Sequence, residues 1–475
     1  MKLLALTVLA ILSNMAFAQE PVMVKNINPN GHSNPKALTC LNNKVYFSAN
    51  TLQNGRELWV SDGTENGTYL QSDVNTGAGV SDPHDLVAFN NKLYFTAYTN
   101  ETAIKRYVTD GNTPAVIFDM PTVNTTRQFG NFTVMGSKLF FYAEDAGFAH
   151  GCELWATDGT TAGTAMVKDI LPGDGSSTPR GMAVYNNRLY FSAQDATHGI
   201  ELWVSDGTEN GTELFVDINL AGSSKPANFT LYDNKLYFTA TDTAAGTELW
   251  VTDGTVTGTT MVKDINYRYG NANPQSLVAY KQYLLFAATD TLGSHLWRTD
   301  GTDSGTVVLD SIVAFPKVGF NDRLYFLSQD TFKFTNYIGA KTQIVSVPDA
   351  DLNAIPQSNL CVCNGSLYFG AQYFASTGIE LYKLNTAQLT LLDENPAVPY
   401  ETLVYPNPAT NSITIYTELD KPVLTVYSAS GSLLHSATIS RGNNLLTTDN
   451  FDNGLYFIHL QAGTKTVTQK LIISR

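Results

Sequence analysis

The sequence predicts an all-β protein, a β-propeller followed by a small β-sandwich of the immunoglobulin-like kind. Three observations support this fold class. A string of the form Glu-Leu-Trp-x-x-Asp-Gly-Thr recurs at a near-constant period, short apolar segments rich in Val, Tyr, Phe and Leu alternate with turn residues, and the period ends before residue 401. A fixed period of this size indicates a repeat architecture.

The repeated string begins at Glu57, Glu153, Glu201 and Glu248, with variants at His295 and Lys105. Its aromatic residue stands at 59, 107, 155, 203, 250 and 297, so one unit is 47 or 48 residues long. Each unit contains four apolar segments, which in the fourth unit are Met182–Tyr185, Leu189–Ala193, Glu201–Ser205 and Glu213–Ile218. Segments of this length and composition are typical of strands. Apolar residues occupy both faces, and this predicts four-stranded sheets that pack radially against their neighbours.

The number of units follows from the second strand, whose Leu-Tyr-Phe signature persists longest. It begins at Lys44, Lys92, Lys138, Arg188, Lys235, Tyr283, Arg323 and Ser366, which predicts eight blades; seven blades with an irregular insert are the alternative. The segment from Val22 to Ile27 matches the fourth-strand string that begins at Met166. We therefore expect this N-terminal strand to complete the last blade, although Gln388–Leu392 competes for that place.

The two ends of the chain carry different signals. Residues 1–18 combine Lys2, an apolar run and Ala16-Phe17-Ala18, a pattern typical of a signal peptide cleaved near Ala18. The propeller is expected at 19–394, a linker at 395–400 and the sandwich at 401–475. The predicted strands of the sandwich are Ser412–Tyr416, Val423–Ser428, Leu433–Ile439, Asn444–Thr447, Gly454–Leu460 and Thr464–Ile473.

Charge and composition exclude some partners. The chain has 475 residues and a net charge of −14, whereas nucleic acids and anionic membranes both require a basic surface. After the signal peptide no apolar stretch is long enough to span a bilayer, so we expect no membrane-spanning segment.

The polar residues of the repeat are expected to be structural. Asp-Gly pairs such as Asp206-Gly207, and Asn-Asn pairs such as Asn186-Asn187, supply the positive φ of tight hairpins. Calcium or sugar binding by the Asp-Gly loops is the alternative, but calcium loops need several carboxylates close together. The glutamates of the string, Glu57, Glu153, Glu201, Glu248 and Glu380, are predicted to form inter-strand ion pairs with the Lys or Arg that begins the second strand.

Cysteine and histidine show no metal or catalytic pattern. Cys152 occupies a variable position and is expected to be exposed, whereas Cys40, Cys361 and Cys363 lie on first strands that a closed ring makes neighbours. A disulfide between Cys40 and that pair is possible only near the ring axis, where the sheets converge. His150 and His198 hold equivalent positions, which we interpret as loop chemistry rather than a metal pair. We assign no catalytic, cofactor-binding or metal-binding residue and no cofactor.

Two families resemble this chain. The recurring Glu-Leu-Trp-x-x-Asp-Gly-Thr string over residues 22–394 is similar to the ELWxxDGT repeat of exported bacterial proteins. The tail resembles the type A C-terminal sorting domain of the type IX secretion system of Bacteroidetes, through Tyr405-Pro406-Asn407-Pro408, Gly454-Leu455-Tyr456-Phe457 and the closing Gln469–Ile473. This resemblance implies type IX machinery as a partner and a secreted or outer-surface location.

The sequence leaves the role of the propeller open. The first hypothesis is a non-catalytic binding or adhesion module for a glycan or protein. The alternative is a carbohydrate-active or other hydrolytic enzyme whose site is assembled from loops of several blades. A third is a purely structural surface repeat.

Overall fold

The computed structural model describes most of the chain. The described residues are 21–99, 103–118, 129–267, 270–310, 315–320, 323–328, 331–335, 345–346, 360–372, 378–385, 402–405, 412–417, 419–428, 432–463 and 465–473. The predicted signal peptide, the segment Gln388–Leu392 and the predicted linker at 395–400 lie outside them. The chain divides into two compact units, Met1–Ala387 and Gln388–Arg475. All regular elements of the described residues are β-strands, which confirms the all-β prediction.

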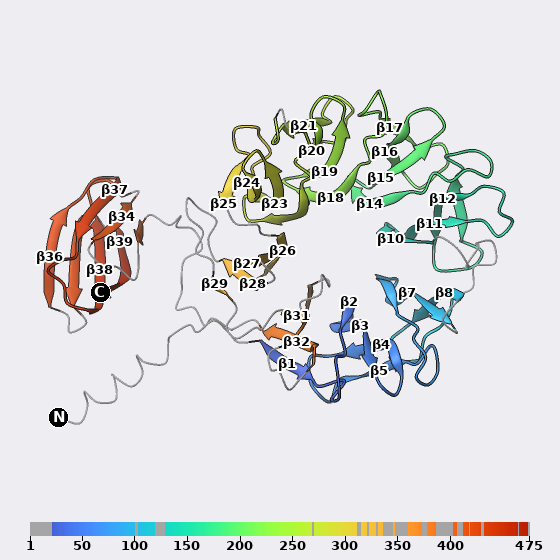
Figure 1. Ribbon diagram of the computed structural model, residues 1–475, viewed down its shortest axis with the longest axis horizontal. Coiled ribbons are helices and arrows are strands. Elements are labelled where there is room, and N and C mark those ends of the chain that lie inside the picture. Colours follow the sequence, from blue (N-terminus) through green and yellow to red (C-terminus); the bar gives the residue numbers. More distant parts are fainter. Residues whose placement is uncertain are drawn as a thin grey trace. The chain divides into compact units, whose positions relative to one another are not determined.

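The described part of the first unit contains eight four-stranded antiparallel sheets (Figure 1). In seven of them four consecutive strands pair in chain order. The first four of these are β2(Lys36–Leu41) to β5(Thr68–Ser72) with β3(Lys44–Thr51) and β4(Gly55–Ser61); β6(His84–Phe89), β7(Lys92–Thr99), β8(Ala103–Thr109) and β9(Val116–Ile117); β10(Phe129–Met135), β11(Lys138–Glu144), β12(Cys152–Thr157) and β13(Ala165–Lys168); and β14(Arg180–Tyr185), β15(Arg188–Asp195), β16(Gly199–Ser205) and β17(Glu213–Val216).

The remaining sheets continue the series and then close it. They are β18(Ala227–Tyr232), β19(Lys235–Asp242), β20(Gly246–Thr252) and β21(Thr260–Lys263); β22(Gln275–Tyr280), β23(Tyr283–Asp290), β24(Gly293–Thr299) and β25(Val307–Asp310); β26(Phe315–Phe320), β27(Arg323–Ser328), β28(Thr331–Thr335) and β29(Val345–Ser346); and β30(Cys361–Cys363), β31(Ser366–Ala371) and β32(Glu380–Asn385) with β1(Val22–Lys25). The four strands expected in the fourth unit are β14 to β17, each within a few residues of its predicted bounds.

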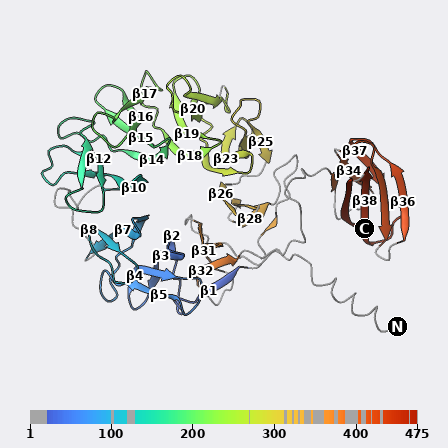
Figure 2. The same ribbon diagram turned by 180° about the vertical axis from the view of Figure 1, so that it is seen from behind.

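The sheets follow one another around a central opening, and the first strand of each lies innermost (Figures 1 and 2). First strands of consecutive sheets contact each other from β2 round to β26, and β2 also contacts β30. The second strands are buried on both faces. Leu189, Tyr190 and Phe191 of β15, for example, are each at most 1% exposed although successive side chains point to opposite faces. Each sheet is therefore covered on both faces, as the apolar pattern predicted.

The N-terminal strand closes the last sheet. β1 pairs antiparallel with β32, so the predicted closure is confirmed. Nearby, the Glu380 carboxylate accepts hydrogen bonds from the backbone N–H of Ile27 at 2.9 Å and of Asn28 at 3.3 Å. A disulfide joins Cys40 on β2 to Cys363 on β30 with Cα atoms 5.4 Å apart; this is the bond that the sequence left possible only near the ring axis. Two segments that lie more than 350 residues apart in the sequence thus meet in one sheet.

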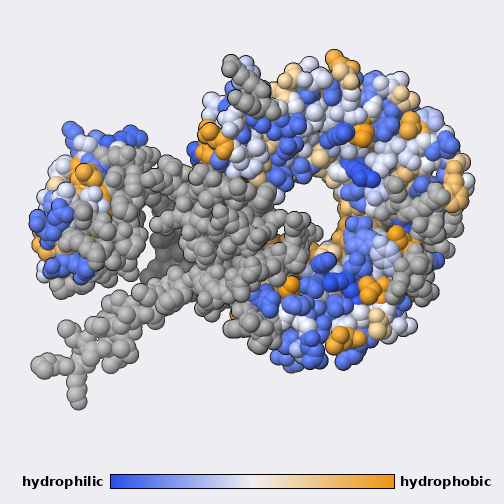
Figure 3. All heavy atoms as spheres, viewed as in Figure 1, coloured by the Kyte–Doolittle hydropathy of each residue, from blue (hydrophilic) through white to orange (hydrophobic). Residues whose placement is uncertain are grey.

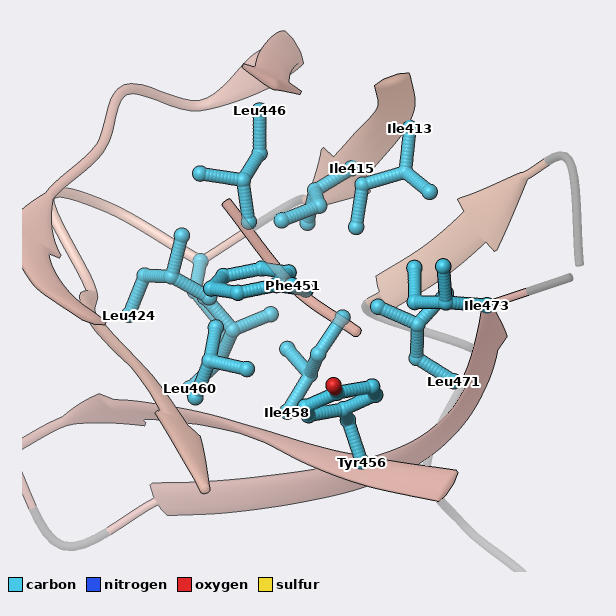
Figure 4. Packing of buried hydrophobic residues seen from close by; sticks show 12 residues of the cluster. Ile413, Ile415, Leu424, Leu446, Phe451, Tyr456, Ile458, Leu460, Leu471 and Ile473 are labelled. Carbon is cyan, nitrogen blue, oxygen red and sulfur yellow. The ribbon is translucent and has the colours of Figure 1, made fainter. Parts of the chain in front are cut away.

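The second unit has two sheets. One has the order β33-β34-β37, with β33(Thr402–Tyr405), β34(Ser412–Thr417) and β37(Gly442–Thr447); the other has the order β36-β35-β38-β39, with β35(Val423–Ser428), β36(Leu433–Thr438), β38(Gly454–Ala462) and β39(Lys465–Ile473). Side chains of both sheets, among them Ile413, Ile415, Ile458 and Leu471, form one buried cluster (Figure 4). The six predicted strands are present, but the sequence analysis missed β33, which runs directly into the Tyr405-Pro406 motif.

Candidate functional site

The strands alternate in direction, so each ring sheet has turns at two opposite ends. We call one end the motif rim; it holds the turns between first and second strands and between third and fourth strands. We call the other end the loop rim; it holds the turns between second and third strands and the loops that lead from a fourth strand to the next sheet. The repeated Asp-Gly-Thr residues all lie on the motif rim.

The Asp-Gly-Thr turns use their own polar groups. In the first unit Asp62 Oδ1 accepts the N–H of Thr64 at 2.8 Å and its hydroxyl at 2.7 Å, while Thr64 Oγ1 accepts the N–H of Gly67 at 2.9 Å. The same bonds recur around Asp158, Asp206, Asp253 and Asp300. The threonine hydrogen bonds lower the pKa of these aspartates. The interpretation as turn chemistry therefore accounts for the motif, although only the glycine of each pair has positive φ.

The glycine of each turn also forms the joint with the preceding sheet. Gly301 has φ +93°, and a Cβ atom there would overlap the hydroxyl of Tyr237 on the neighbouring sheet. Tyr46, Tyr94 and Tyr368 occupy the same place under their glycines, and Phe140 does so in the third unit. The Leu-Tyr-Phe and Asp-Gly-Thr signatures are thus two halves of one inter-sheet contact.

The predicted ion pairs of the repeat glutamates are wrong. In the antiparallel register Val45 pairs with Ser61 and Ala49 with Glu57, which places Lys44 beside Asp62 and far from Glu57. Glu57 is instead fully buried and accepts hydrogen bonds from the N–H of Val74 at 2.7 Å and the hydroxyl of Ser81 at 2.6 Å. It therefore holds the loop that leads to the next sheet.

This clamp recurs with the other repeat glutamates. Glu153, Glu201 and Glu248 accept the N–H of a residue 17 positions later, namely Ile170, Ile218 and Ile265. Burial raises the pKa of Glu57, Glu153 and Glu248 to about 7, and it also raises the pKa of Glu201 and Glu380. A perturbed carboxyl group is a common sign of a functional site. Here the carboxylates are enclosed and occupied by backbone donors, so the physical role is to hold the loop rim.

The loop rim differs from unit to unit and carries exposed apolar side chains. We call the following set the loop-rim tips: Leu52, Val80, Phe148, Leu220, Tyr267 and Leu292. Leu220 and Leu292 are 88% and 86% exposed, respectively. On the motif rim, Val256 at 55% is the only exposed large apolar side chain of the turns that the structure describes. Exposed apolar side chains also occur at strand ends beside the motif rim, namely Val116 at 62% and Leu231 at 51%, so the two rims differ mainly in their turns.

Three histidines of the loop rim pair within their own turns. His198 Nδ1 lies 2.7 Å from Asp195 Oδ2, and this bond raises the pKa of His198. His150 lies 3.6 Å from Asp145, and His295 lies 3.4 Å from Asp290. These three pairs belong to three different sheets, which supports the interpretation as loop chemistry. Within the described ranges there is no group of three or more His, Cys, Asp or Glu that could hold a metal ion.

The innermost strands also vary in polarity. Their second residue has positive φ at a bulge and changes identity from unit to unit: Ala37, Asp85, Gly181, Asn228 and Ser276. On the face that Figure 3 shows, hydrophilic residues gather around the central opening. A set of unlike residues on a symmetric scaffold is where one distinct ligand can be recognised.

Two side chains depart from the sequence analysis. Cys152 is buried, not exposed, because the loop after β13 folds over it: the N–H of Thr178 donates to its carbonyl at 2.9 Å. Arg106 was missed; it is 2% exposed on β8, where other units have Leu58 or Leu154. Burial lowers the pKa of Arg106 to about 9, and the charge of Asp85 opposes that shift. The sequence does show an arginine where other units have a core leucine, and this difference could have identified Arg106 as a buried charged residue.

The tail matches a known family. Residues 403–474 match the family described as secretion system C-terminal sorting domain, Por_Secre_tail. This confirms the tail part of the predicted resemblance and implies export by the type IX system to the cell surface or the medium. No helix in the described ranges is long and apolar enough to cross a membrane. No curated protein matches the chain.

Solved structures show distant likeness. PorZ, a bacterial surface component of the type IX secretion system of Porphyromonas gingivalis, aligns at 12% identity and TM-score 0.40, covering 96% of this chain and 70% of PorZ. Prolyl oligopeptidase B of Galerina marginata aligns at 10% identity and TM-score 0.45, covering 82% of this chain and 57% of the peptidase. Sqt1 of Saccharomyces cerevisiae aligns at 10% identity and TM-score 0.43, covering 77% of this chain and 100% of Sqt1. The chain thus spans little more than half the length of the peptidase.

Proposed function

We propose that this protein is an exported, non-catalytic binding module: an eight-bladed propeller of the ELWxxDGT kind, preceded by a signal peptide cleaved near Ala18 and followed by an immunoglobulin-like sorting domain. The eight four-stranded sheets and the β1–β32 pairing support the blade number. The two-sheet tail with a shared core supports the sandwich. The domain bounds are those that the change in periodicity indicates, 19–394 and 401–475.

One observation carries the binding role, namely the contrast between the two rims. The recurring polar residues of the motif are occupied by turn, joint and clamp contacts, whereas the loop-rim tips expose much of their apolar surface to solvent. Exposing this surface to water costs free energy that a partner would recover. The recognition surface is therefore the loop rim.

The composition of the tips favours a protein partner over a glycan. Four of the six tips are aliphatic, and only Phe148 and Tyr267 offer the flat aromatic faces on which sugar rings stack. Protein interfaces, in contrast, bury aliphatic and aromatic side chains inside a polar rim.

The test uses the mature full-length protein on arrays of polysaccharides and of extracellular proteins, scored for binding and for turnover. We expect binding to a protein without turnover of any polysaccharide. The Leu220→Ser and Leu292→Ser double variant should lose binding, whereas Val256→Ser on the motif rim should keep it. Polysaccharide turnover would support the alternative that the protein is an enzyme. Binding that only Val256→Ser abolishes would place the binding site on the motif rim and contradict the proposal.

A further inference from the structure

The strand β36 is an edge strand of the tail, as is β37 of the other sheet. In the four-stranded sheet β36 pairs with β35 on one side and with no described strand on the other (Figures 1 and 2). The opposite edge strand, β39, contacts β33 of the second sheet. The backbone of β36 therefore presents N–H and C=O groups that another strand can bind.

The side chains of β36 do not protect this edge. Natural proteins blunt an exposed edge with Lys, Pro or other charged residues, but β36 reads Leu-Leu-His-Ser-Ala-Thr. Leu433 is 56% exposed and Leu434 is 45% exposed. In the pairing of β35 with β36, Val426 pairs with His435 and Tyr427 with Leu433, so Leu434 is an extra residue on β36.

The match of this tail to a sorting domain names the kind of partner. A sorting domain acts by being recognised, and recognition requires a surface that its own fold leaves open. We propose that β36 is the docking edge of the tail, and that an extended segment of the type IX machinery adds to it as a further strand while Leu433 and Leu434 fill apolar pockets. Main-chain hydrogen bonds supply affinity in this mode, and the pockets supply selectivity. The inference rests on the proposed export of this chain by its tail.

The test is export of the full chain in its native host. We compare wild type with the double variant Leu433→Lys and Leu434→Lys, because lysines on an edge strand oppose strand addition. Surface and medium signal should fall at least about tenfold, with accumulation in the periplasm. The matched control is Leu445→Lys, which changes a 73% exposed leucine on β37 of the other sheet and should be exported normally.

Two further measurements separate the possible failures. The unfolding midpoint of the purified double variant should equal that of wild type, because both leucines are exposed; if it falls, the single variants Leu433→Lys and Leu434→Lys with native midpoints replace it. A chain that ends at Pro399 should remain in the periplasm. Normal export of that chain would overturn the proposed export route. If the chain that ends at Pro399 stays in the periplasm but the β36 variants are exported normally, the proposal that β36 is the docking edge is overturned and the export route stands. The same conclusion follows if Leu445→Lys lowers export as much as the β36 variants do.

Discussion

The motif rim and the loop rim are opposite ends of the same strands, but they differ in how they use the sequence. On the motif rim each Asp-Gly-Thr turn repeats the same hydrogen bonds, and its glycine lies against a tyrosine or phenylalanine of the preceding sheet. On the loop rim the turns differ in residues, and their tips are unlike apolar side chains such as Phe148 and Leu292. In this protein the repeated residues stabilise the fold, and the residues that vary between units are those that can recognise a partner.

The two rims are nevertheless coupled through the repeat glutamates. Glu201 belongs to the repeated string, but its carboxylate accepts the N–H groups of Ile218 and Ser224 in a variable loop. A constant residue thus holds a changing loop by binding only its backbone. Four changes test how the two rims are held: removal of the closing strand, loss of a repeat glutamate, a larger side chain at a turn glycine, and a change of pH.

The largest effect is expected from removing the strand that closes the ring. Deletion of residues 19–28 removes β1 and the N–H donors of Ile27 and Asn28, which leaves the buried Glu380 without two of its hydrogen bonds. An edge of the last sheet is also exposed. Thermal denaturation should show a midpoint lower by many degrees, whereas a chain ending at Pro399 should keep the wild-type midpoint. An unchanged midpoint in the deletion would show that β1 does not hold the ring.

The next largest effect is expected from the clamp. Glu201→Ala leaves the buried N–H groups of Ile218 and Ser224 without acceptors, and each unsatisfied group costs about 1–3 kcal/mol. We expect the free energy of unfolding in urea to fall by about 3 kcal/mol. Glu209→Ala, a change at an exposed glutamate of the same unit, is the control and should have little effect. Equal values for the two variants would contradict the clamp.

A smaller effect should separate backbone strain from the inter-sheet joint. Gly301 and Gly270 have similar φ values of +93° and +100°, but a Cβ at Gly270 meets no atom within 4 Å, whereas one at Gly301 overlaps Tyr237. Gly270→Ala should cost about 1 kcal/mol through strain alone, and Gly301→Ala should cost more. Adding Tyr237→Phe to Gly301→Ala should recover part of the difference, because Phe140 fills this place naturally. Chemical denaturation of all three variants measures these differences in the free energy of unfolding.

A further expected effect is a pH dependence of the scaffold. Burial raises the pKa of Glu57, Glu153 and Glu248 in the folded protein from 4.5 to about 7, so between these values the folded state binds more protons than the unfolded state. Their contribution to stability is fully present below pH 4.5 and is lost as the pH rises through 7. The denaturation midpoint should therefore be higher at pH 5 than at pH 8, and Glu248→Gln should reduce the slope. A midpoint that rises between pH 5 and pH 8 would contradict the assignment.

The sequence alone located most of the strands of this protein and indicated that they form repeated units. Alternating apolar residues and turn signals located strands such as β35 and β15, because these signals act over a few residues. The 47-residue period indicated repeated sheets, and the orphan segment Val22–Ile27 indicated how the ring closes. The tail motifs identified a sorting domain for the same reason, since they lie within one short stretch.

Only the tertiary structure decided what the polar residues do. Whether Glu57 meets Lys44 depends on strand register, and the register places Asp62 beside that lysine instead. Whether Cys152 is exposed depends on a loop that begins more than ten residues later and folds back over it. The loop-rim tips share no motif and lie on one side of the ring only because antiparallel strands bring their turns to the same end. Spacing in the sequence reports local conformation, whereas these contacts arise from the packing of whole sheets.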